Sequence, residues 1–186
     1  MILRPALYAA ALLLASTALA QPAPQRFAIP EHGAVLLDVP SAWRVADKAS
    51  ANPPAVSIRL QPPDGDSFDV QMTAVWLEPA KRAEMTPEVI KQRVQATSQE
   101  LLPQSVEKEA PLTELRGKQA LGYYFSLTDR QSQNTGTDYK YIAEGTVTVG
   151  DVVLIFTFLH REPGIPAKEQ ALQVVRDAGY AREQAK

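Results

Sequence analysis

The chain has 186 residues, no cysteine, 19 basic and 21 acidic residues, and a formal net charge of −2 at pH 7. The absence of cysteine excludes disulfide bonds and lipid attachment at an N-terminal cysteine. The mildly acidic balance argues against nucleic acid or an anionic membrane as a partner, because either would require a basic stripe.

An export signal is predicted at the start of the chain. Arg4 precedes an apolar run over residues 6–15, and Ala18-Leu19-Ala20 supplies the small residues of a cleavage site. The run is too short to span a membrane. We therefore predict a signal peptide over residues 1–20, cut after Ala20, and a periplasmic or secreted mature protein with no membrane span. Cleavage removes one basic residue and no acid, which leaves 18 basic and 21 acidic residues and a net charge of −3.

The mature chain is predicted to form one domain behind a short leader. Residues 21–26 include Pro22 and Pro24 and show no periodicity, so we expect a flexible tether. Residues 27–182 have the length of a single domain with a substantial core. Its first strands, at residues 27–29 and 34–39, flank a turn sequence that ends in glycine.

A second hairpin is predicted after an irregular stretch that ends at Asn52-Pro53-Pro54. Apolar and polar residues alternate over residues 56–61 and again over residues 68–76, on either side of a turn rich in proline and aspartate. Such alternation is typical of strands with one buried face. We expect the opposite face, which includes Asp69, to be solvated.

Two helices are expected, with a strand between them. Thr86 and Pro87 are favourable residues for the start of a helix, and apolar residues at helical spacing follow as far as Leu101. The second helix should begin near Pro166 and end near Gly179, with a frayed tail after it. Its expected buried residues are Ala171, Leu172, Val175 and Ala178. Residues 107–115 are predicted to form an edge strand.

The chain is organised around a predicted antiparallel meander at residues 120–127, 139–147 and 152–159. Gly150-Asp151 suits a tight two-residue turn that pairs Val149 with Val152. This register places Gly145 opposite Phe156, whose ring can cover the glycine. The third strand is apolar on both faces, which is typical of a central strand covered on both sides.

The first two strands of the meander are joined by a longer polar loop, so their register depends on a further assumption. If Leu127 faces Tyr141, then Leu121, Tyr123 and Phe125 share the buried face of Phe156. We predict an α+β fold with a curved antiparallel sheet, a long C-terminal meander and helices packed on both faces.

The order of elements resembles one known superfamily. A hairpin ending in Val39-Pro40-Ser41-Ala42-Trp43 precedes the capped helix, which is followed by a meander containing Gly122-Tyr123-Tyr124 and by a closing helix. This arrangement is similar to the PsbP-like superfamily, which includes small exported proteins of the DcrB type. The resemblance implies a largely non-enzymatic accessory or assembly factor, and it assigns no functional residue.

The sequence contains few residues that indicate chemistry. A zinc site would require both His32 and His160 together with carboxylates, and we interpret the two histidines as ordinary surface residues. Asp64, Asp66 and Asp69 resemble a sparse calcium loop, although an Asp- and Gly-rich turn explains them better. The sequence has no nucleophile elbow and no phosphate-binding glycine loop. We therefore expect no catalytic site, cofactor or metal.

A cluster of tyrosines on the first two meander strands marks a candidate interaction surface, because tyrosine combines an apolar ring with a polar tip. The ordinary preference of tyrosine for strands also explains the cluster. The surface comprises Tyr124, Arg130, Asp138, Tyr139, Lys140 and Tyr141. Arg130 and Asp138 are expected to form an exposed ion pair.

Two functions remain open from the sequence. The first is a non-catalytic accessory protein that binds a protein of the cell envelope through the tyrosine surface. The alternative is a module that binds a lipid or another small apolar ligand in a pocket between a helix and the sheet, which a strand with two apolar faces could line.

Overall fold

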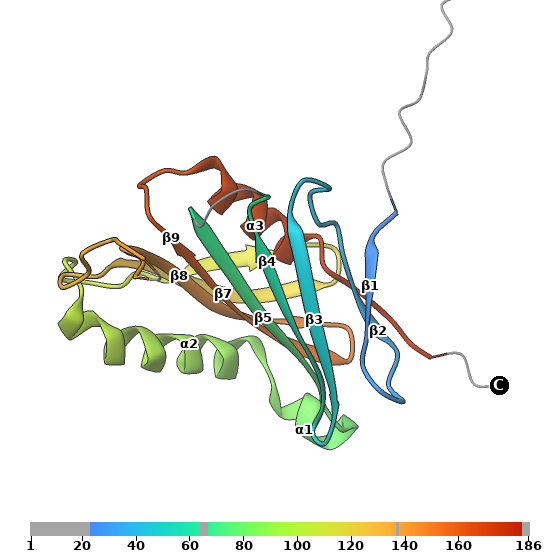
Figure 1. The fold of residues 1–186 in the computed structure, drawn as a ribbon. Helices are drawn as coiled ribbons and strands as arrows, with labels where there is room; N and C mark the ends of the chain where they lie inside the picture. Colours follow the sequence, from blue (N-terminus) through green and yellow to red (C-terminus); the bar gives the residue numbers. More distant parts are fainter. Residues whose placement is uncertain (1–22, 64–66, 137, 184–186) are drawn as a thin grey trace, which may run out of the picture.

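A computed structural model describes residues 23–63, 67–136 and 138–183. The predicted signal peptide lies outside the described residues, and so do Asp64 and Asp66 of the aspartate-rich turn. The described chain is mixed α+β, as predicted, and its two sheets are antiparallel (Figure 1). The strands are β1 Gln25–Ala28, β2 Ala34–Leu37, β3 Arg44–Ala51, β4 Pro54–Gln61, β5 Phe68–Trp76, β6 Thr113–Arg116, β7 Ala120–Thr128, β8 Tyr141–Val149, β9 Val152–His160 and β10 Gly179–Ala181. The helices are α1 Pro79–Glu84, α2 Pro87–Leu101, the 3₁₀ turn Leu102–Gln104 and α3 Pro166–Arg176.

The larger sheet has seven strands in the order β3-β4-β5-β9-β8-β7-β6, and the smaller has the order β1-β2-β10. The doubly apolar strand β9 is central, as predicted, because β5 and β8 flank it on either side. The tight turn at Gly150-Asp151 sets the predicted register, with Val149 opposite Val152 and Gly145 opposite Phe156. A Cβ atom at Gly145 would lie 2.8 Å from the ring of Phe156. The packing reason predicted for this glycine is therefore confirmed.

The predicted register between β7 and β8 is wrong by one residue. Leu127 pairs with Ile142, and Tyr141 pairs with Thr128. Side chains alternate faces along a strand, so this shift moves Leu121, Tyr123 and Phe125 to the face opposite Phe156. The long polar loop after β7 does not specify the register locally.

Close backbone packing favours the observed register. A Cβ atom at Gly122, which lies on the Phe156 side of β7, would be 2.0 Å from the carbonyl oxygen of Thr146. The register also buries Phe125 and Leu127 against α2.

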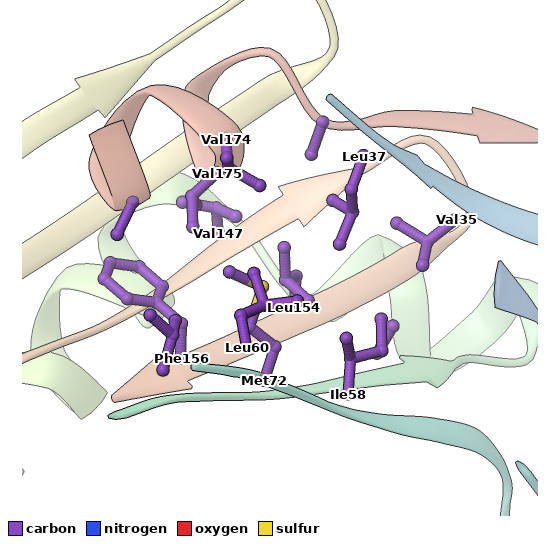
Figure 2. Packing of buried hydrophobic residues seen from close by; sticks show 14 of the residues in the cluster. Val35, Leu37, Ile58, Leu60, Met72, Val147, Leu154, Phe156, Val174 and Val175 are labelled. Atoms are coloured by element: carbon purple, nitrogen blue, oxygen red, sulfur yellow. The ribbon is translucent and has the colours of Figure 1, made fainter. Parts of the chain in front are cut away.

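The large sheet separates two apolar layers. On the side that we call the α3 face, α3 and the small sheet cover the side chains of the central strands (Figure 2). The residues labelled there include Phe156, Leu154 and Val147 of the large sheet. On the opposite side, the α2 face, α2 packs on β7 and β8. The expectation of helices on both faces is therefore confirmed.

The two long helices begin where the local signals predict. The hydroxyl of Thr86 accepts a hydrogen bond from the backbone N–H of Val89, and Pro87 opens α2. Ile90 and Val94 are buried on its inner side. Helix α3 begins at Pro166 and has a buried apolar side, as predicted.

Several elements differ from the expectations. The irregular stretch before Asn52 is the edge strand β3, and the expected frayed tail contains β10, which pairs with β2. Each of these two strands forms along a neighbouring strand, β3 along β4 and β10 along β2. Their own sequences show little alternation of apolar and polar residues, and for that reason they were not predicted. The edge strand expected at residues 107–115 is confined to β6, and β1 begins at Gln25, inside the expected leader. Helix α1 has no buried residue and was not predicted.

Candidate functional site

The α2 face is covered over only part of its width. Helix α2 packs on β7 and β8, whereas side chains of β4, β5 and β9 on the same face are exposed. The exposed residues include Arg59, Gln71 and Ile155. We call the α2-side surface of β3, β4, β5 and β9 the open half. In Figure 1 the view places α2 below the sheet and α3 above it.

A groove of about 460 Å³ lies at one end of the open half, between the sheet and the helices α1 and α2. Ile155 of β9 lies on its surface with 44% of the residue exposed, whereas the next residue, Phe156, is 2% exposed. We call this hollow the Ile155 groove. Its apolar lining residues are Val75, Leu77, Met85, Val89, Val153 and Ile155.

Asp151 forms two ion pairs near this groove, and one of them connects it to α1. Arg82 Nη1 lies 2.9 Å from one carboxylate oxygen of Asp151, and Arg182 Nε lies 2.8 Å from the other. Asp151 belongs to the turn between β8 and β9, and its carbonyl accepts a hydrogen bond from Leu77. The turn that sets the meander register thus also positions the short helix.

Three charged side chains line the Ile155 groove. They are Lys81 and Glu84 of α1 and Arg93 of α2. Within the described residues, none of the three makes a side-chain hydrogen bond or an ion pair with the protein. The groove therefore has an apolar floor and two free cations against one carboxylate.

A second hollow, of about 420 Å³, lies on the open half near β3 and β4 and includes Arg59. The guanidinium of Arg59 donates two hydrogen bonds of 2.8 Å to Asp69, and Gln71 donates a third of 3.0 Å. Asp69 is 2% exposed, so the expectation that it is solvated is wrong. A buried carboxylate requires such partners. Asp69 in turn raises the pKa of Arg59 through hydrogen bonding and charge attraction.

Glu144 is a half-buried carboxylate on the same face, between Phe125 of β7 and Thr157 of β9. Burial raises the pKa of Glu144 above its ordinary value. No described side chain donates a hydrogen bond to it, so the protein offers no compensation for the charged form.

The residues of the predicted tyrosine surface do not all lie together. Tyr124 lies on the α3 face, where its ring centroid is 6.4 Å from that of Phe156. Tyr141 stacks on His160 at 5.1 Å, and Tyr139 lies against the guanidinium of Arg161 at 4.9 Å. These tyrosines therefore have aromatic or cationic neighbours in their own chain.

The expected ion pair between Arg130 and Asp138 is absent from the described residues. Arg130 Nη2 instead donates to the carbonyl of Ser105. The carboxylate of Asp138 accepts hydrogen bonds from the backbone N–H groups of Gln133 and Asn134. Arg130 therefore bonds to the backbone of the turn at Ser105, and Asp138 bonds to the backbone of its own loop.

One part of the predicted surface borders a small pocket. Tyr139, Lys140 and Tyr141 line a hollow of about 130 Å³ beyond the C-terminal end of α2, together with the apolar residues Leu127 and Ile142.

Both histidines interact with aromatic rings rather than with carboxylates. His32 stacks on Trp76 at 3.7 Å, and His160, 3% exposed, contacts Tyr141 and Phe158. The expectation that His160 is a surface residue is therefore wrong. Its Nδ1 atom lies 2.7 Å from the carbonyl oxygen of Glu162, which makes Nδ1–H the donor. Across the described ranges, no group of three or more His, Asp or Glu side chains is placed to hold a metal ion.

Ser126 and Lys168 form the nearest approach to a nucleophile with a base. Lys168 Nζ donates to Ser126 Oγ at 3.0 Å and so connects α3 to β7. Acyl transfer would further require oxyanion donors facing a bound substrate. Neither residue lines the two hollows of the open half or the pocket beyond α2. We interpret the hydrogen bond as a packing contact.

The groove residues Lys81, Arg93 and Ile155 were not predicted as site residues from the sequence. The one signal, for Ile155 alone, was the apolar character of both faces of β9, which predicted a strand covered on both sides or, in the alternative function, a strand that lines an apolar pocket. In the part of the chain that the structure describes, the helices are too short or too polar to cross a bilayer. No family model matches the chain, and no curated protein is significantly similar to it.

Proposed function

We propose that this chain is an exported, non-catalytic binding protein of PsbP-like architecture that holds a small apolar ligand in the Ile155 groove. One observation supports this function above the others. A central strand exposes 44% of an isoleucine at the surface of a groove of about 460 Å³. Ligand sites are typically concave, mostly apolar and between about 300 and 1,000 Å³ in volume.

The surroundings of Ile155 support a ligand rather than incomplete packing. Val153 and Val75 extend the apolar floor along β9 and β5, and Met85 and Val89 form the wall on the helix side. Methionine adapts its shape to different ligands because its side chain is unbranched and polarisable. The groove lies between the sheet and the helices α1 and α2, and this position supports the proposal of an apolar-ligand site.

The test uses N-phenyl-1-naphthylamine, a neutral apolar dye whose fluorescence rises in an apolar site. We expect the purified chain to bind the dye and the variant Ile155→Glu to lose that binding, because a charge on the groove floor opposes apolar occupancy. The matched control is Val106→Glu, since Val106 is 57% exposed and lies outside the groove. Equal binding by both variants would contradict the proposal.

A second candidate function follows from the pocket beyond α2. Its lining by Tyr139, Lys140 and Tyr141 supports the hypothesis that a protein of the cell envelope docks at this end of the sheet. Cross-linking in the periplasm, followed by purification of the tagged chain, tests it. The expected result is one partner that is recovered with the parent chain and lost from a Tyr139→Ala, Tyr141→Ala variant. Recovery of the same proteins with both chains would contradict this second function.

A further inference from the structure

We propose that the ligand of the Ile155 groove is an anionic single-chain amphiphile, with its head group bound by Lys81 and Arg93 and its apolar chain lying over Ile155. This inference rests on the proposed function, since it assigns the chemistry of the ligand in that groove. The shared chemistry is a carboxylate, sulfate or phosphate attached to one alkyl chain.

The positions of the two cations provide the first argument. Lys81 belongs to α1 and Arg93 to α2, so two separate helices each direct one cation to the same groove. Arg93 follows Val89 by one turn of α2, and residues four apart lie on the same side of a helix, so α2 places a cation beside an apolar lining residue. Lys81 lies in α1, and Met85, at the C-terminal cap of that helix, lines the same groove.

The absence of protein partners for these cations provides the second argument. Among the described residues, Lys81 and Arg93 form no ion pair, whereas Arg82 of the same short helix pairs with Asp151. Glu84 is the one carboxylate that lines the groove, so the positive charges outnumber it. A carboxylate or phosphate would form charge-assisted hydrogen bonds with both cations, and the planar guanidinium suits such anions especially well.

The size of the groove favours one alkyl chain. Its volume of about 460 Å³ lies in the lower half of the range for ligand pockets. Its apolar floor crosses from β5 to the adjacent strand β9, so one alkyl chain can contact Val75 and Ile155 together. Each methylene group that is buried should strengthen binding about fourfold.

The experiment compares three ligands with the same ten-carbon chain, namely decanoate, decanol and decyltrimethylammonium, as competitors of the neutral dye. We expect decanoate to bind most tightly, decanol less tightly and the cation most weakly. Octanoate should bind about fifteenfold more weakly than decanoate, because it buries two fewer methylene groups. The affinity for decanoate should fall between about 0.05 M and about 0.5 M salt, and the affinity for decanol should not.

A double variant tests the assignment of the head group. Lys81→Met with Arg93→Met should weaken decanoate binding about five- to tenfold, to the level of decanol, and leave decanol unchanged. The matched control is Lys108→Met with Lys118→Met, which removes the same charge from exposed sites outside the groove. This control should bind decanoate as the parent chain does.

The possible outcomes separate the two proposals. Equal affinity for decanoate and decanol, or tightest binding of the cation, overturns the anionic head group while apolar ligand binding stands. If neither the dye nor any ten-carbon ligand binds, the proposed function itself fails. If the chain sediments as a dimer that Ile155→Glu converts to a monomer, a second copy occupies the groove and both proposals are overturned.

Discussion

The two faces of the large sheet differ in how completely they are covered, and adjacent residues of one strand show the difference. Phe156 on the α3 face is 2% exposed beneath α3 and the small sheet, whereas Ile155 on the α2 face is 44% exposed. An apolar strand face therefore does not ensure that a layer covers it. The α3 face supplies the main core of the fold, and the incompletely covered face supplies the candidate site.

The largest expected effect on stability comes from replacing Phe156, the core residue on the α3 face. Phe156→Ala should lower the free energy of unfolding by about 3–5 kcal/mol, because it removes a buried aromatic ring and leaves a cavity. Ile155→Ala, one residue away, should cost less than about 1 kcal/mol, since much of that side chain already contacts solvent. Urea unfolding of both variants measures the difference. Equal losses would show that the α2 face is as well packed as the α3 face.

A smaller loss of stability is expected when the buried carboxylate of Asp69, on the open half, loses its arginine partner. Arg59→Ala should cost about 2 kcal/mol, because it leaves Asp69 buried with only Gln71 as a side-chain partner. Since Arg59 itself is more than half exposed, the cost should be lower than for a fully buried pair. Lys48→Ala on the same surface should change stability by less than about 0.5 kcal/mol. If Arg59→Ala and Lys48→Ala change the free energy of unfolding equally, Arg59 does not stabilise Asp69.

A pH-dependent loss of stability is predicted from His160. Burial lowers the pKa of His160, the hydrogen bond to the Glu162 carbonyl opposes this decrease, and the charge of Lys168 adds to it, so the folded protein binds this proton less readily than the unfolded chain. The stability from the neutral ring is therefore fully present above the ordinary pKa of 6.5 and is lost as the pH falls below it. Unfolding curves between about pH 8 and pH 5 measure the trend.

The control for this pH dependence is His160→Asn. Its amide can still donate a hydrogen bond to the Glu162 carbonyl, and it does not titrate. The variant should lose less stability than the parent chain over the same pH interval. A slope equal to that of the parent chain in the His160→Asn variant would contradict the assignment.

The smallest expected effect is a gain in stability from Glu144→Gln. Burial raises the pKa of Glu144, so the charged carboxylate destabilises the folded state at neutral pH. The contribution of this group is most favourable below its ordinary pKa of 4.5 and is lost as the pH rises through the raised value. The variant should therefore be more stable than the parent at pH 7, and the two should converge in acid. A less stable variant at pH 7 would indicate that the carboxylate has a favourable partner.

The sequence by itself determined the elements whose signals are local. Gly150-Asp151 specified the register of β8 and β9, and Thr86-Pro87 and Pro166 specified where two helices begin. A two-residue turn or a helix cap acts through neighbouring backbone groups, so distant contacts are not needed to define it.

The tertiary structure decided the features that depend on contacts between distant segments. Only packing against α2 and β8 fixed which face of β7 carries Phe125, because the polar loop between the strands permits either register. Only the fold buried Asp69 beside Arg59, and only the fold placed Lys81, Arg93 and Ile155 around one groove. Whether a strand face is covered or exposed depends on how the separate layers pack against each other. The alternation of side chains along one strand cannot specify that packing.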